Sequence, residues 1–178
     1  MSRRCLIKAV WSALLCVTLA GCGWAQRAVD ATRETARDAF IRPVTTLHLD
    51  ITARTALNTH SQDMLGLSVP TLVRVYQLSD PDLLLRASYE QLLDNADLAL
   101  GASVLEQHAR VIRPEQGVRL DVPLDSAATH VAVVALLQEP QASAGQWRLV
   151  LERKALQRNV PRVVELAGQR LTLRPLEP

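Results

Sequence analysis

Apolar and polar residues alternate strictly along the segment that begins at residue 45, and this two-residue period restricts the fold more than any other feature of the chain. The apolar positions are Leu47, Leu49, Ile51 and Ala53, and the polar positions are Thr46, His48, Asp50 and Thr52. Successive side chains of a β-strand point to opposite faces of a sheet. The pattern therefore predicts a strand with one buried and one solvated face.

Further short segments rich in strand-forming residues follow, with turn residues between them. They are 71–78, 104–112, 118–124, 130–138, 147–156, 162–166 and 170–173. The last two are predicted to form a hairpin across Ala167-Gly168-Gln169. Segment 130–138 is almost continuously apolar, which is typical of a central strand. Seven or eight short strands predict a mainly β fold of two stacked sheets, a β-sandwich.

One stretch between these strands has the period of a helix. Leucines, alanine and tyrosine recur on one helical face at Leu85, Tyr89, Leu92, Leu93, Ala96 and Leu100. Asp80 could cap this stretch with Pro81 in the first turn, or Ser88 could cap it together with Gln91. Gly101 is placed where a helix ends. We expect a small helical insertion at about residues 81–100, with this face packed against a sheet.

The first residues have the pattern of an export signal. Arg3, Arg4 and Lys8 precede the apolar residues 9–20. As a helix this apolar run would rise about 18 Å, too little to cross a hydrocarbon core of about 30 Å. It is therefore predicted to be a cleaved signal segment and not a membrane anchor. The run ends in Leu19-Ala20-Gly21-Cys22, which is similar to the lipobox of bacterial lipoproteins. An ordinary signal peptide with a chance cysteine is the alternative.

The lipobox implies that Cys22 receives a covalent diacylglycerol and an acyl chain, and we expect no other cofactor. Gly23 follows in place of aspartate, which resembles Gram-negative lipoproteins sent to the outer membrane. The start, Ser2–Lys8, also resembles a twin-arginine signal, so the general and the twin-arginine export routes both stay open. The predicted division is a signal peptide at 1–21, a lipidated N-terminus and tether at 22–43, and the sandwich domain at 44–178.

Charge and composition exclude several classes of function. Removal of Arg3, Arg4 and Lys8 leaves 17 of the 20 basic residues against 18 acidic residues, a net charge of −1. This near-neutral balance, with few aromatic residues, argues against nucleic-acid binding. No cysteine follows Cys22, so the domain has no disulfide and no thiolate chemistry.

The chain shows no sequence motif of an enzyme or a metal site. Its four histidines lack the spacing of metal ligands. Asp80 and Asp82 could form a carboxylate pair, but a helix cap and a first-turn charge account for them better. We expect a binding or structural protein, with no metal, no small-molecule substrate and no enzymatic activity.

Several motifs occur in a fixed order after the lipobox. After Leu57-Asn58, Pro70 precedes Val73-Arg74-Val75-Tyr76-Gln77-Leu78, and Leu100-Gly101-Ala102, Pro114 in a turn and Trp147-Arg148 follow. This order, and above all the similarity of 70–78 to the family motif P-x-x-V-R-V-Y-Q-L, resembles the TssJ family, the outer-membrane lipoproteins of type VI secretion systems. The resemblance implies a transthyretin-like β-sandwich with a small helical addition. It further implies a domain that faces the periplasm and is held to the outer membrane by lipid.

The same resemblance implies a protein partner, the periplasmic C-terminal region of TssM, and through it TssL and the rest of the secretion membrane complex. In the family the loop between the first two strands contacts TssM, and here that loop is 58–70. The predicted contact residues are Asn58, Thr59, His60, Ser61, Gln62, Asp63, Met64, Leu65, Gly66, Leu67 and Ser68.

The composition of this loop is compatible with that role. Met64, Leu65 and Leu67 are apolar residues in a mostly polar loop, and Gly66 permits a tight tip. Exposed apolar side chains on an anchored loop offer surface that a partner can bury. Alternatively, Leu65 and Leu67 extend the second strand and pack inward.

Two other classes of function stay open for the whole protein. One is a generic periplasm-facing envelope lipoprotein with a binding or chaperone role, and the other is a lipid-anchored hydrolase with a polar pocket.

Overall fold

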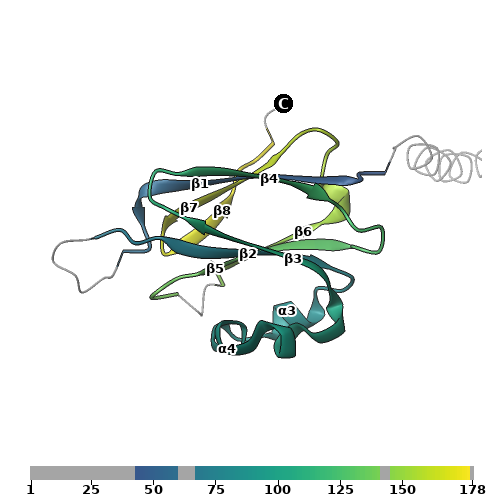
Figure 1. The fold of residues 1–178 in the computed structure, drawn as a ribbon, viewed down its shortest axis with the longest axis horizontal. Helices are drawn as coiled ribbons and strands as arrows, with labels where there is room; N and C mark the ends of the chain where they lie inside the picture. Colours follow the sequence, from purple (N-terminus) through teal and green to yellow (C-terminus); the bar gives the residue numbers. More distant parts are fainter. Residues whose placement is uncertain (1–42, 60–66, 141–144, 177–178) are drawn as a thin grey trace, which may run out of the picture. The chain divides into compact units, whose positions relative to one another are not determined.

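Eight β-strands form two four-stranded sheets in the computed structural model, which describes residues 43–59, 67–140 and 145–176. The strands are β1 (Thr46–Leu57), β2 (Thr71–Leu78), β3 (Val104–Ile112), β4 (Gly117–Pro123), β5 (His130–Leu136), β6 (Arg148–Glu152), β7 (Arg162–Gly168) and β8 (Arg170–Leu173). The two sheets lie face to face (Figure 1). The predicted two-sheet, mainly β fold is confirmed.

The order of strands places β1 and β2 inside their respective sheets. The first sheet has the order β4-β1-β7-β8, and the second has the order β3-β2-β5-β6. All pairs are antiparallel except β1 with β7, which is parallel. The predicted hairpin is formed by β7 and β8. The predicted strand 147–156 is shorter, because β6 ends at Glu152 and the 3-10 helix η3 (Arg153–Ala155) follows.

The core lies between the sheets and follows the two-residue period of the sequence. Leu47, Leu49 and Ile51 of β1 are fully buried, whereas the residues between them are partly exposed. Strand β5 is buried along almost its whole length, since one face meets the core and the other is covered by helices. This arrangement explains why 131–136 is continuously apolar while β1 alternates.

Gln77 is a buried polar residue that ties the two sheets together. Its side-chain nitrogen donates to Glu106 Oε2 and to the carbonyl oxygen of Pro123, both at 2.8 Å. Its side-chain oxygen accepts from the backbone N–H of Asp125 at 2.7 Å. Glu106 lies on β3 and Pro123 ends β4, so one amide joins both layers. Burying this amide is tolerated because its hydrogen bonds are satisfied.

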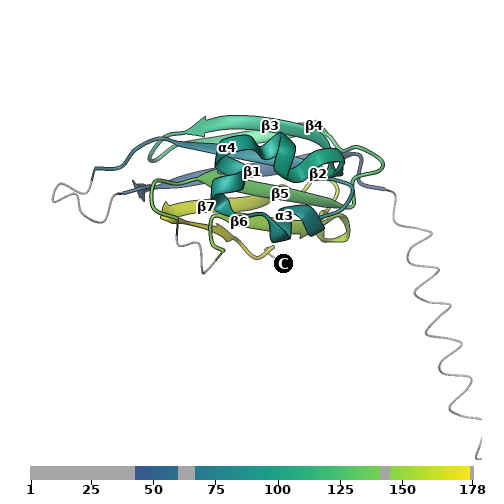
Figure 2. The same cartoon turned by 90° about the horizontal axis from the view of Figure 1, so that it is seen from below.

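Two helices between β2 and β3 cover the outer face of the second sheet. They are α3 (Asp82–Arg86) and α4 (Tyr89–Leu100), followed by the 3-10 helix η1 (Gly101–Ser103), and Figures 1 and 2 show them lying across this sheet. Ser88 and Gln91 form the predicted capping box at the start of α4. The predicted insertion at about 81–100 therefore matches the observed helices.

The predicted helical face is wrong at Leu85 and Leu93, which are exposed, whereas Leu84 is buried. At Leu85 the cause is a break in the helix, because Ala87 has an extended backbone (φ −64°, ψ 138°) between α3 and α4. A single helical period cannot continue through such a residue. A second break inside α4 lies at Asn95 (φ −154°, ψ 85°).

Side chains from the sheet fix the helices through their carbonyl groups. Arg148 of β6 donates to the carbonyl oxygens of Leu84, Leu85 and Ala87 at 2.5–3.0 Å, which satisfies the end of α3. Arg74 of β2 donates to the carbonyl oxygen of Leu92 at 2.9 Å. The helices are therefore held to the second sheet by arginines as well as by leucines.

Candidate functional site

The loop between β1 and β2 leaves the sandwich from a tightly fixed base, which we call the loop base: Leu57–Thr59, Ser68–Val69, Gln138 and Gly168–Gln169. Asn58 is 2% exposed and has a positive φ of 51°. Asparagine tolerates this left-handed conformation better than most residues. Its Oδ1 accepts from the backbone N–H of Gln138 at 2.7 Å, and its own N–H donates to the carbonyl oxygen of Gly168 at 2.8 Å.

The returning side of the loop is fixed to the departing side. Ser68 Oγ accepts from the backbone N–H of Leu57 at 3.2 Å and donates to the carbonyl oxygen of Thr55 at 2.6 Å. The N–H of Val69 donates to the carbonyl oxygen of Leu57 at 3.2 Å. These bonds close the loop at its root before Leu67, which is 58% exposed.

The turn between β7 and β8 supports the same base. Gln169 Nε2 donates to the carbonyl oxygen of Thr59. Gly168 occupies the turn with a positive φ of 57°, a conformation that a side chain would strain. A pocket of about 290 Å³ lies beside the turn, lined by Gln146, Ala167, Gly168, Gln169 and Arg170. Figure 1 shows the ends of β1, β2, β7 and β8 gathered at this end of the sandwich.

The predicted contact residues divide into three groups. Asn58 is a buried anchor, while Thr59 and Ser68 are partly buried at the base. Leu67 is exposed, so it is a large apolar side chain of the described part of this loop that a partner could reach. His60, Ser61, Gln62, Asp63, Met64, Leu65 and Gly66 lie outside the described residues, as does Cys22.

Sequence analysis missed the supporting residues Gln138, Gly168 and Gln169. They lie 80 to 110 positions from their partners at Asn58 and Thr59. No local period or motif marks such pairings. The contacts with Gly168 and Gln169 depend on the parallel alignment of β1 with β7, and Gln138 follows β5 of the other sheet.

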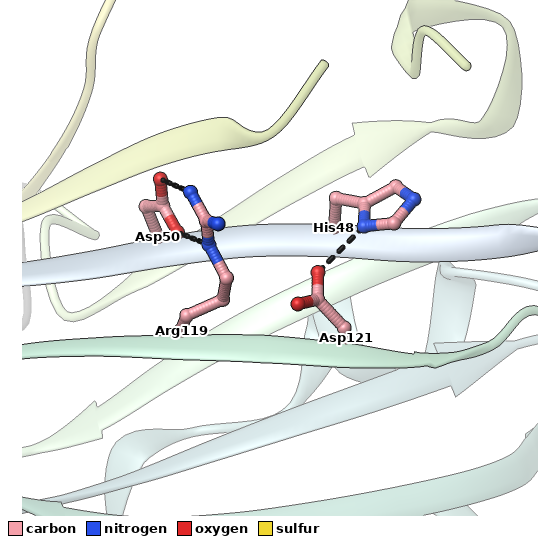
Figure 3. Close-up of polar contacts among 4 residues, drawn as sticks. All are labelled: His48, Asp50, Arg119 and Asp121. Atoms are coloured by element: carbon pink, nitrogen blue, oxygen red, sulfur yellow. Dashed lines mark hydrogen bonds and ion pairs between the residues drawn. The ribbon is translucent and has the colours of Figure 1, made fainter. Parts of the chain in front are cut away.

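The outer face of the first sheet carries a second polar cluster, which Figure 3 shows. Arg119 of β4 forms a bidentate ion pair with Asp50 of β1. Its Nε donates to Oδ1 at 2.9 Å and its Nη2 donates to Oδ2 at 3.2 Å. His48 Nδ1 lies 2.5 Å from Asp121 Oδ1. These are cross-strand pairs of opposite charge, which stabilise the pairing of β1 with β4.

Acid is expected to reduce the stability that this face contributes, because protonation of Asp50 removes the negative charge that pairs with Arg119. The hydrogen bond from Arg119 lowers the pKa of Asp50 below its usual value of 3.8. A lowered folded-state pKa stabilises the protein above the unfolded pKa, and that contribution is lost as the pH falls through the folded pKa. We expect Asp50→Asn to remove at most about 1 kcal/mol at pH 6 and almost nothing near pH 2. Urea unfolding at both pH values measures this, and an equal loss at both would contradict it.

The described residues contain neither a metal-binding cluster nor a membrane-spanning helix. In residues 43–59, 67–140 and 145–176, no group of three or more histidine, cysteine, aspartate or glutamate side chains could hold a metal ion. Over the same ranges, every helix is too short or too polar to span a membrane.

Residues 45–169 match the model of the family described as type VI secretion lipoprotein, with the member names SciN, VasD, EvfM and TssJ. A chain of the structure described as "T6SS protein TssM C-terminal domain (869-1107) from EAEC" is 37% identical to this chain, covering 75% of this chain and 100% of that one, with a TM-score of 0.67. A chain of a "Type VI membrane complex" is also 37% identical, covering 74% and 99%, with a TM-score of 0.70.

Similarity extends to a lipoprotein from Pseudomonas aeruginosa. The crystal structure of its T6SS lipoprotein TssJ1 is 26% identical, covering 76% of this chain and 100% of that one, with a TM-score of 0.60. No significantly similar curated protein was found. The family match covers the helices, the loop base and every strand except β8, and the chain therefore belongs to the TssJ family of type VI secretion lipoproteins.

Proposed function

We propose that the protein is anchored in the outer membrane by lipid on Cys22, with its domain in the periplasm, and that it binds the periplasmic C-terminal region of TssM. It would thereby connect the outer membrane to the inner-membrane part of the machine, with TssL as an indirect partner. Family membership and the lipobox at Leu19–Cys22 support the anchor. The descriptions of the two structures at 37% identity, which name TssM and a type VI membrane complex, support the partner. The family is one of secretion lipoproteins and not of enzymes.

The proposed binding site rests on one observation: hydrogen bonds hold the loop base in place, and the adjacent Leu67 is exposed. Hydrogen bonds from three separate connections fix the root of the loop, so little ordering entropy would be lost there on binding. Leu67 is 58% exposed immediately outside this fixed root. A rigidly placed apolar side chain is the kind of residue that contributes strongly to an interface.

Leu67→Ser is expected to weaken the affinity for the periplasmic C-terminal region of TssM at least about tenfold, because burial of a leucine contributes about 1.5–3 kcal/mol. The affinity can be measured by calorimetry with the mature chain. Val160→Ser is the matched control, since Val160 is also exposed but lies away from the loop. Equal affinity of the Leu67→Ser variant and the wild type would count against the loop as the contact.

A further inference from the structure

The helical insertion carries more exposed leucine than its packing requires. The described residues expose seven large aliphatic side chains substantially, and four of these lie on α3 and α4: Leu83, Leu85, Leu93 and Leu98. Leu98 is the extreme case, with 82% of its surface exposed. The contact with the second sheet is already made by other leucines, such as Leu84, Leu92 and Leu100, which are fully buried. The exposed leucines therefore have no role in the fold that the structure reveals.

The break in α4 at Asn95 creates a pocket beside the most exposed of these leucines. Asn95 Oδ1 accepts from the backbone N–H of Leu98 at 3.0 Å, which fixes the break. The pocket has a volume of about 400 Å³ and is lined by Gln91, Asp94, Asn95, Leu98 and Ala99. It combines aliphatic walls with a carboxylate and two amides. A lysine or arginine side chain has the matching chemistry, an apolar stem with a cationic head.

The insertion is also strongly acidic. Residues 80–100 contain five acidic side chains and one basic side chain, Arg86, in a mature chain whose net charge is only −1. Arg86 pairs with Asp82 at 3.1 Å. In the part of the chain that the structure describes, Glu90, Asp94 and Asp97 are exposed and form no ion pair. Unpaired acidic charge disfavours an anionic lipid surface and favours a cationic partner.

We propose that the outer side of α4, which we call the α4 surface (Glu90, Leu93, Asp94, Asp97, Leu98 and the pocket at Asn95), is a second docking surface for a basic amphipathic segment of another envelope protein. Apolar side chains of that segment cover Leu93 and Leu98, and a lysine or arginine enters the pocket beside Asp94. Charge complementarity favours a basic amphipathic partner, because the surface combines exposed leucine side chains with carboxylates that form no ion pair. The α4 surface lies on different elements from the loop base, so it does not depend on the proposed function.

Site-specific photo-crosslinking in cells tests this surface on the full-length, lipid-anchored protein. A photoreactive amino acid replaces Leu98 in one chain and Val160 in the control chain. We expect a crosslink from position 98, but not from 160, to a segment of another protein that mass spectrometry identifies as basic and amphipathic. Asp94→Lys with Asp97→Lys should reduce this crosslink about fivefold, because two attractive contacts become repulsive.

Glu115→Lys is the matched control for the charge reversal, since Glu115 lies in the turn between β3 and β4. It should leave the crosslink unchanged, and the α4 variants should melt at the wild-type temperature because the altered residues are exposed. A crosslink to a second copy of this chain, to lipid or to an acidic segment would overturn the proposal. So would the absence of any crosslink at position 98, or a crosslink that survives the double charge reversal.

Discussion

Cells that produce the Cys22→Ser chain are expected to lose all acylation of this protein, its outer-membrane attachment and effector delivery. The serine hydroxyl cannot replace the thiol that receives diacylglycerol in the proposed lipidation. The acyl chains would bury several tens of CH₂ groups at about 0.8 kcal/mol each, so their loss converts an effectively permanent attachment into none. Incorporation of labelled palmitate, together with separation of the two membranes on a sucrose gradient, measures the effect.

Cys16→Ser is the matched control, because Cys16 lies in the predicted signal peptide and should not carry lipid. It should leave palmitate incorporation and effector delivery at wild-type levels. The anchor proposal fails if the Cys22→Ser chain still incorporates palmitate, or if it supports normal effector delivery.

Asn58→Ala is expected to destabilise the domain by about 1.5–3.5 kcal/mol. Alanine loses the acceptor for the part-buried Gln138 N–H, and a hydrogen bond of this kind contributes about 0.5–1.5 kcal/mol. Alanine must also adopt the positive φ of 51°, which costs about 1–2 kcal/mol. Because Asn58 holds the loop base, affinity for TssM should fall as well. Urea unfolding gives the first quantity, and calorimetry gives the second.

Asn58→Gly separates the two causes. Glycine accepts the positive φ without strain but still lacks the side-chain oxygen, so its loss of stability should be smaller than that of alanine. Asn58→Asp keeps an acceptor for the Gln138 N–H and should retain most of the stability at neutral pH. A free energy of unfolding within about 0.5 kcal/mol of wild type for Asn58→Ala would refute the anchor role.

Local patterns predicted most of the strands because each strand buries one face or both. The alternation of Leu47, Leu49 and Ile51 predicted β1, and the almost continuously apolar segment 130–138 predicted the covered strand β5. The predicted helical face was partly wrong because Ala87, which has an extended backbone, separates α3 from α4 and interrupts the helical period. Such a break depends on tertiary contacts, including the bonds from Arg148 to the end of α3, which a local period does not encode.

The sequence predicted less of the candidate site than of the fold. Apolar residues in the loop indicated a contact surface, and Leu67 is indeed exposed. The same reasoning could not separate Asn58, a buried anchor, from residues that a partner could touch. That distinction arises from pairing with Gln138 and Gly168, 80 and 110 residues away along the chain. The surface of α4 was missed because its leucines were assigned to packing.

Co-flotation with liposomes tests the central claim most directly, because it requires the lipid anchor and the protein contact at the same time. The acylated mature chain is reconstituted into liposomes, mixed with the periplasmic C-terminal region of TssM and centrifuged through a density gradient. We predict that wild type carries the TssM region to the top. A chain in which Met64-Leu65-Gly66-Leu67 is replaced by glycine and serine should float without it. Equal flotation of the TssM region with both chains, or an acylated wild type that leaves it at the bottom, would contradict the account.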